Sequence, residues 1–146
     1  MVESLTELGG RLLVVYDGHC GLCNRAVRWF LRHDRLDRLR FVASESAKVA
    51  ELFARPGIAA ESAPSTILVV RDARSPAECV LVRSEAVLAL LRELPRPWPA
   101  VAAMLGWIPR PVRDLGYRLI ARWRYRIWGR LASCPLPTAE ERARFL

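Results

Sequence analysis

Residues 12–24 read LLVVYDGHCGLCN, a sequence in which an apolar run is followed by two cysteines three positions apart. Its first five residues form a short apolar run in which valine and tyrosine favour a strand. From residue 21 to about residue 33, apolar side chains recur every three to four positions while arginines occupy another face. The stretch therefore predicts a buried strand, a short turn and an amphipathic helix, with Cys20 and Cys23 where the helix begins.

Further apolar segments continue this alternation of strands and helices. Three more short strands are predicted, at residues 40–43, 66–70 and 79–82. The last two form a hairpin around a turn at residues 72–77. Helices are predicted at residues 44–54, capped by Ser44, and at residues 84–94. The resulting order, βαβαββα, is that of the thioredoxin and glutaredoxin core, an α/β fold with a mixed four-stranded sheet flanked by helices.

A proline-rich boundary separates a core of residues 1–95 from an α-helical C-terminal extension of residues 96–146. Both parts are expected to form a single domain, because 146 residues is an ordinary length for one domain. The extension is predicted to hold helices at residues 100–108 and 112–130, and a last turn capped by Thr138 and Glu141. The apolar stripe of its longer helix consists of Val112, Gly116, Leu119, Ile120, Trp123 and Ile127.

The composition is that of a globular protein. Hydrophobic residues make up 52% of the chain and charged residues 26%, enough to bury a core. The longest uncharged stretch, residues 97–109, has 13 residues, whereas a membrane-spanning helix needs about 20. The first ten residues carry two glutamates and no apolar run, so no secretory signal is expected and the predicted location is cytoplasmic. In a reducing compartment a close cysteine pair is typically catalytic or metal-binding.

The Cys20-x-x-Cys23 pair is predicted to stand at a helix N-terminus. Unpaired backbone N–H groups there carry roughly half a positive charge, which stabilises a thiolate, the species that attacks disulfides. Two intervening residues let the second sulfur reach the first, so a local disulfide can close. A Cys-x-x-Cys between a strand and a helix is typical of a thioredoxin-like redox site.

Two other interpretations of the cysteine pair stay open. A zinc site would need two further ligands, and zinc is not expected because the other cysteines are poorly placed. Cys79 lies in a predicted strand as a small core residue, and Cys134 lies in the distal tail. Alternatively, the pair is inert, because free cysteine is often buried. Covalent haem attachment requires histidine directly after the second cysteine, and Asn24 stands there.

Residues 16–24, YDGHCGLCN, resemble the signature of the DCC family of thiol-disulfide oxidoreductases, named for the pattern Asp-x-x-Cys-x-x-Cys. The matching positions are Asp17, Cys20 and Cys23. The resemblance spans nearly the whole chain and continues through Arg113-Asp114-x-x-Tyr117, Tyr125-x-x-Trp128-Gly129, Cys134 and the closing Arg144-Phe145-Leu146. It implies a thioredoxin-like fold and dithiol chemistry, and it implies no particular substrate.

The expected roles follow from each side chain's position at the helix start. Cys20 is expected to attack a substrate disulfide, and Cys23, one turn further on and more buried, to resolve the mixed disulfide. Asp17 either caps the helix or relays a proton for Cys23, and an Asp-Gly pair is also an ordinary turn. No cofactor is expected beyond the redox-active disulfide. The expected partners are a protein or small-molecule disulfide or dithiol and an external thiol reductant.

Three further residues are candidate modulators of this site. A protonated His19 would stabilise the Cys20 thiolate, although a loop histidine without a role is an equal alternative. Ser65 occupies the position at which thioredoxins place a cis-proline, and Pro64 falls one residue early. Cys134 is either a third redox cysteine or, as the favoured alternative, a structural residue.

Positive charge is concentrated in the extension. Of the formal net charge of +8, residues 96–130 carry +7, with eight arginines against Asp114 alone. The favoured interpretation is that Trp107 and Trp123 pack the extension onto the core with the arginines solvated around it. Contact with a membrane surface through residues 98–130 comes next, and nucleic acid is the least favoured partner because no recognition motif accompanies the charge. The competing functional hypothesis is therefore a non-catalytic module that binds a membrane or polyanion through these helices.

Overall fold

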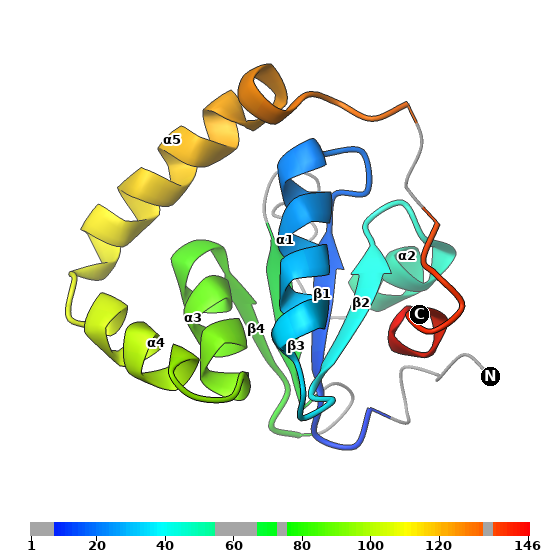
Figure 1. Cartoon of the computed structure of the whole chain (residues 1–146), viewed down its shortest axis with the longest axis horizontal. Coiled ribbons are helices and arrows are strands. Elements are labelled where there is room, and N and C mark those ends of the chain that lie inside the picture. Colours follow the sequence, from blue (N-terminus) through cyan, green and yellow to red (C-terminus); the bar gives the residue numbers. More distant parts are fainter. Residues whose placement is uncertain (1–7, 55–66, 73–75, 133–135) are drawn as a thin grey trace.

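A mixed four-stranded sheet lies at the centre of the computed structural model, which describes residues 8–54, 67–72, 76–132 and 136–146 (Figure 1). The strands are β1 (Leu12–Tyr16), β2 (Leu39–Ala43), β3 (Leu68–Arg71) and β4 (Cys79–Val82), in the order β2-β1-β3-β4. β1 pairs with β2 in parallel, whereas β3 is antiparallel to both β1 and β4. This arrangement confirms the predicted mixed sheet of a thioredoxin-like fold.

The two faces of the sheet are covered by different helices. All five residues of β1 are buried, and because successive side chains point to opposite faces they supply two cores. Tyr16 and Val14 join α1 (Gly21–His33) and α3 (Arg83–Glu93) on one face. Val15 and Leu13 join α2 (Ala47–Phe53) on the other face. The β1–α1 junction therefore rests on a strand that is fixed from both sides.

Helix α2 begins later than the sequence indicated. Its N-cap is Ser46, whose Oγ accepts a hydrogen bond from the backbone N–H of Lys48 at 3.3 Å. The expected cap, Ser44, was therefore wrong. The backbone N–H of Ser44 donates to the carbonyl of Tyr16 at 2.8 Å and so keeps the chain beside β1 for one more residue.

The C-terminal extension packs along α3 and then reaches the start of α1. It contains α4 (Trp98–Gly106), α5 (Arg110–Trp128) and the 3₁₀ turn η2 (Arg142–Arg144). In Figure 1, α5 runs along the outer edge of the molecule from α4 to the N-terminal end of α1. The predicted cap near the chain end is confirmed, because Thr138 and Glu141 each donate a backbone N–H to the other's side chain.

Helix α5 docks through its polar face, contrary to the sequence expectation. The apolar stripe of α5 is largely exposed, Trp107 is exposed as well, and the fully buried residue of α5 is Arg124. The partly or fully buried residues of α5 recur every three to four positions: Arg113, Asp114, Tyr117, Ala121, Arg124, Tyr125 and Trp128. The interpretation that Trp107 and Trp123 pack the extension onto the core is therefore wrong.

Specific polar partners explain why this face docks. Asp114 accepts a hydrogen bond from Ser84, and Arg113 forms an ion pair with Glu85 at 2.8 Å, both on α3. The hydroxyl of Tyr117 accepts the backbone N–H of Ile67 at 2.8 Å. No helix in the described part of the chain is long and apolar enough to cross a membrane.

Candidate functional site

The two cysteines lie within the first turn of α1, as the sequence predicts. Cys20 is the N-cap residue, and its Sγ accepts the backbone N–H of Cys23 at 3.4 Å. The backbone N–H of Cys20 in turn donates to the carbonyl of Asp17 at 3.2 Å, which closes the turn between β1 and α1. Both thiols are free in this structure. The arrangement places the Cys20 sulfur where the helix N-terminus stabilises negative charge.

Burial of the two cysteines is the reverse of the expected order. Cys20 is 0% exposed, whereas Cys23 is only partly buried, so the expectation that Cys23 is the more buried was wrong. The cause is the covering segment, residues 129–131, which follows α5. Its Gly129 carbonyl accepts the N–H of Gly21 at 3.2 Å, and Arg130 pairs with Cys20 as an antiparallel β-bridge.

Gly21 allows this close approach. A Cβ atom built at Gly21 would lie 2.3 Å from the carbonyl oxygen of Trp128, so no larger residue fits unless the end of α5 shifts. The covering segment is also held at its far end, because the N–H of Leu131 donates to the carbonyl of His19 at 2.6 Å. Backbone contacts thus hold the segment across the cysteine pair.

A buried arginine connects α5 with the second cysteine. Arg124 donates from Nη1 to the Sγ of Cys23 at 3.8 Å and from Nη2 to Asp17 at 3.4 Å. The same Nη2 donates to the hydroxyl of Tyr125 at 3.1 Å, and that hydroxyl donates to Asp17. The cluster is therefore Cys23, Arg124, Asp17 and Tyr125, assembled from residues more than 100 positions apart.

Asp17 holds this cluster and does not cap α1. Its Oδ1 accepts the backbone N–H of His19 at 2.9 Å, its Oδ2 faces Arg124 and Tyr125, and the N-cap is Cys20 itself. The helix-cap role expected for Asp17 was therefore wrong, and the alternative role, proton relay, stays a prediction. Asp17 thus joins the β1–α1 turn to the end of α5.

Ionisation of the second cysteine is strongly opposed. Burial raises the pKa of Cys23 to about 12, helped by its hydrogen bond to Cys20 and the negative charge there, while the Arg124 guanidinium acts in the opposite direction. Burial, followed by the hydrogen bond to Asp17, also raises the pKa of Tyr125. At neutral pH the Cys23 thiol therefore keeps its proton.

The guanidinium of Arg124 stays charged despite its burial. Burial on its own lowers the pKa of Arg124, but attraction to the ionised forms of its neighbours, Cys23 and Tyr125 first, outweighs that effect and raises it. A cation held permanently beside Cys23 offers a partner for the thiolate that forms when Cys23 loses its proton.

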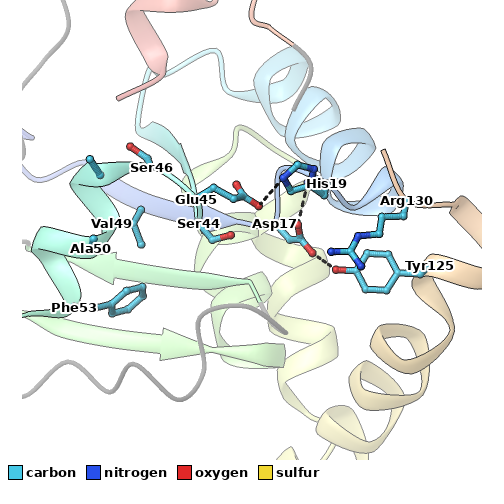
Figure 2. Close-up of a pocket in the computed structure, with 11 residues that line it drawn as sticks. Asp17, His19, Ser44, Glu45, Ser46, Val49, Ala50, Phe53, Tyr125 and Arg130 are labelled. Atoms are coloured by element: carbon cyan, nitrogen blue, oxygen red, sulfur yellow. Dashed lines mark hydrogen bonds and ion pairs between the residues drawn. The ribbon is translucent and has the colours of Figure 1, made fainter. Parts of the chain in front are cut away.

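A pocket of about 620 Å³ opens next to this cluster (Figure 2). Asp17 and His19 line it from the β1–α1 turn, Tyr125 from the end of α5 and Arg130 from the covering segment. The other lining residues lie just before α2 or on it: Ser44, Glu45, Ser46, Ala47, Val49, Ala50 and Phe53. Its walls carry both charges and apolar side chains, and His19 faces Glu45 at 3.8 Å across the mouth. The pocket lies beside the covering segment, because Arg130 lines it and also pairs with Cys20.

The remaining candidate residues have different outcomes. His19 lies at the site, where its Nδ1 is 3.1 Å from the carbonyl of Leu131. Cys79 is exposed at the start of the edge strand β4, so the expectation of a core residue was wrong. Ser65, Pro64 and Cys134 lie outside the described residues, and their roles stay predictions. Within the described ranges, no three His, Cys, Asp or Glu side chains gather as a metal site would require.

A family of known proteins matches most of the chain. The family described as DCC1-like thiol-disulfide oxidoreductase matches residues 14–130. The chain belongs to this family. It is 37% identical over 134 residues to the DCC family protein At1g52590, chloroplastic, of Arabidopsis thaliana, covering 92% of this chain and 74% of that protein. It is 29% identical over 134 residues to the uncharacterized protein YuxK of Bacillus subtilis (strain 168), covering 92% and 93%. No solved structure matches the chain significantly.

The DCC1-like match includes the elements that sequence reasoning left out of the site. It extends through Arg130 and therefore covers α5, Arg124 and most of the covering segment. A signal for these residues was present, because the motifs Arg113-Asp114-x-x-Tyr117 and Tyr125-x-x-Trp128-Gly129 contain much of the docked face of α5. Arg124, between the two motifs, carried no signal that distinguished it from the other arginines of the helix.

Proposed function

We propose that this DCC1-like protein exchanges its Cys20–Cys23 dithiol with the disulfide of a protein or small-molecule substrate. The observation that carries the proposal is the N-cap position of Cys20, with Cys23 one turn further on beside the buried cation of Arg124. A helix N-terminus stabilises an attacking thiolate, and a nearby cation assists a resolving one.

In the first step the Cys20 thiolate attacks one sulfur of the substrate disulfide. A bond forms between the Sγ of Cys20 and that sulfur, and the other substrate sulfur leaves as a thiolate that takes a proton from water. Cys23 does not compete for this step, because its pKa is raised to about 12 and its thiol stays protonated.

In the second step Cys23 attacks the Sγ of Cys20. The Cys20–Cys23 disulfide forms, the substrate sulfur leaves, and the proton of Cys23 goes to that leaving thiolate. The Arg124 guanidinium, 3.8 Å from the Cys23 sulfur, stabilises the negative charge that develops there. Two electrons have then passed to the substrate, and an external dithiol reductant returns the pair to its starting state.

Asp17 acts in this scheme as a positioning residue. Its carboxylate accepts hydrogen bonds from the backbone N–H of His19, from Arg124 and from Tyr125, and so anchors the Arg124 guanidinium beside Cys23. Removing Asp17 would leave the Arg124 guanidinium without its carboxylate partner and shift it relative to Cys23.

Access to Cys20 requires the covering segment to move. Because Cys20 is completely buried beneath residues 129–131, no disulfide can touch its sulfur in this conformation. Displacement of the segment exposes Cys20 beside the pocket of Figure 2, where the substrate chain can lie against His19 and Phe53.

A single-turnover assay tests the proposal. Reduced protein is mixed with a short peptide disulfide, and both are alkylated and mapped by peptide mass. The unaltered protein should reduce one disulfide per chain, Cys20→Ser should reduce none, and Cys23→Ser should accumulate a mixed disulfide between Cys20 and the peptide. Cys79→Ser is the matched control, because this exposed thiol lies outside the site.

Two results would overturn the proposal. One is full activity of Cys20→Ser. The other is failure of the unaltered dithiol to reduce the peptide at any pH, which would favour the non-catalytic module instead.

A further inference from the structure

The outer side of α5 carries an exposed row of large apolar side chains. Leu115, Leu119, Trp123 and Ile127 are spaced four residues apart and therefore lie on one face of the helix. Each is between 42% and 64% exposed. Over the 19 residues of α5 the row follows a helix roughly 28 Å long. An exposed patch of this kind typically marks an interaction site.

A second row, of cations, runs beside the first. Arg118, Arg122 and Arg126 are again four residues apart, and each lies three residues after a member of the apolar row. All three side chains are exposed, and the guanidinium of Arg126 lies 5.2 Å from the centre of the Trp123 ring. The exposed side of α5 is therefore apolar along one flank and positive along the other.

The apolar surface continues onto the end of α4. Met104 is 73% exposed and Trp107 is 90% exposed at the corner where α4 leads into α5. Between α3, α4 and α5 lies an apolar groove of about 410 Å³, to which Ile108, Val112 and Ile120 contribute. We name this whole surface, from Met104 to Ile127, the outer face.

The charge of the outer face decides between its potential occupants. Arg118, Arg122 and Arg126 form its exposed positive row, so two copies of the chain brought together at this face would juxtapose two such rows. The surface of a bilayer with anionic lipids can bind the apolar row and the arginine row at the same time. Apolar side chains enter the boundary between headgroups and acyl chains, while arginines contact phosphate.

We propose that the outer face of α4 and α5 binds the surface of a bilayer that contains anionic lipids, with α5 lying in the plane of the interface. The inference is independent of the thiol chemistry, because the cysteines and Arg124 lie on the opposite, docked side of α5. Membrane contact through the outer face therefore leaves the redox site intact.

Vesicle sedimentation with the full chain tests this inference. Vesicles of phosphatidylcholine alone are compared with vesicles containing about 30 mol% phosphatidylglycerol, a content that gives a negative surface. The anionic vesicles should bind the protein at least about tenfold more tightly, and about 0.5 M NaCl should remove most of this difference. Tryptophan emission should shift to shorter wavelength on binding, since Trp107 and Trp123 leave water.

Matched variants assign the binding to the outer face. Arg118→Gln with Arg122→Gln should weaken binding roughly 30-fold, given the usual contribution of each arginine near a charged membrane. Arg25→Gln with Arg28→Gln removes the same charge from exposed positions of α1 and should change binding less than about threefold. Leu119→Gln with Trp123→Gln should remove most of the sedimentation with anionic vesicles while leaving single-turnover disulfide reduction unchanged.

Four results would overturn the inference. They are no binding to anionic vesicles, equal losses in the two arginine pairs, a dimer that Leu119→Gln with Trp123→Gln dissociates, and tighter binding to a single-stranded oligonucleotide than to the vesicles. A failure of disulfide exchange alone would leave the membrane inference standing, since the two assays use different residues.

Discussion

Helices α1 and α5 are both amphipathic, but they use their two faces in opposite ways. Helix α1 buries Val27 and Phe30 against the sheet and exposes its arginines, as an ordinary surface helix does. Helix α5 buries Arg124 and exposes Trp123 and Ile127. The periodic pattern of apolar and polar residues therefore defines two faces of a helix. Which face packs against the protein depends on the residues that the helix meets there.

The partners of α5 are polar along its whole docked face, from Ser84 and Glu85 on α3 to the cluster beside the cysteine pair. The Arg124 guanidinium donates hydrogen bonds to the carboxylate of Asp17 and to the sulfur of Cys23. Just after α5, the carbonyl of Gly129 accepts the backbone N–H of Gly21 at the start of α1. Because these contacts are made by polar groups, the polar side of α5 faces the rest of the protein. Its apolar side is then free for another surface.

Replacement of Arg124, the buried arginine of α5, should lower the free energy of unfolding the most. Arg124→Met leaves the carboxylate of Asp17 buried without its cation, and such losses cost about 3–5 kcal/mol of unfolding free energy. Arg126→Met, an exposed arginine of the same helix, should change stability by no more than about 0.5 kcal/mol. Urea unfolding measures both, and equal costs would show that α5 does not dock through Arg124.

A pair of glycine substitutions should have the next largest effect. Gly21→Ala forces a Cβ against the Trp128 carbonyl and should cost about 1–3 kcal/mol, while accelerating alkylation of Cys20 as the covering segment shifts. Gly116→Ala, where a Cβ meets nothing within 4 Å, should stabilise α5 by up to about 1 kcal/mol. An unchanged alkylation rate in a folded Gly21→Ala protein would mean that the segment does not control access.

The raised pKa of Cys23 should make the reduced protein less stable in alkali. The folded state keeps this proton up to a pKa of about 12, whereas an unfolded thiol loses it near about 8.5, so unfolding releases a proton between these values. Stability should therefore fall as pH rises through this window in the reduced protein. Cys23→Ser should lack this decline in stability. It should keep only the decline due to Tyr125, whose pKa is also raised above that of an ordinary tyrosine. Identical profiles for the two proteins would contradict the assignment.

The outer face should contribute least to folding. Leu119→Gln with Trp123→Gln should shift the free energy of unfolding by less than about 1 kcal/mol, because about half of each residue is already exposed to water. Thermal and urea unfolding without lipid measure this change. A loss of several kcal/mol would show that these side chains pack in the folded monomer after all.

The β1–α1 unit could be predicted from sequence because its signals are local. The run at residues 12–16 and the helix from residue 21 match β1 and α1, and the cysteines stand at the junction as expected. The hairpin strand β4 was also placed correctly, but Cys79 proved exposed because β4 is an edge strand. Local pattern predicts the element, whereas exposure depends on what lies beside it.

The rest of the site could not be predicted because it depends on contacts distant in sequence. Nothing near Arg124 shows that Asp17 lies opposite, and nothing near Cys20 shows that residues 129–131 cover it. Eight arginines in residues 96–130 made a solvated face the natural interpretation, and one of the eight is buried. The roles of Ser65 and Cys134 stay predictions, as do the domain boundary near residue 95, the absence of a cofactor and the cytoplasmic location.

A redox titration measures directly whether Cys20 and Cys23 interconvert between a dithiol and a disulfide. Purified protein is equilibrated across a series of thiol buffers, its thiols are trapped by alkylation, and the cysteines are mapped by peptide mass. The thiols should show one two-electron transition that joins Cys20 to Cys23, within about −180 to −270 mV, the range of known oxidoreductases. A pair that never closes, or that closes only with Cys134 or between molecules, would contradict it.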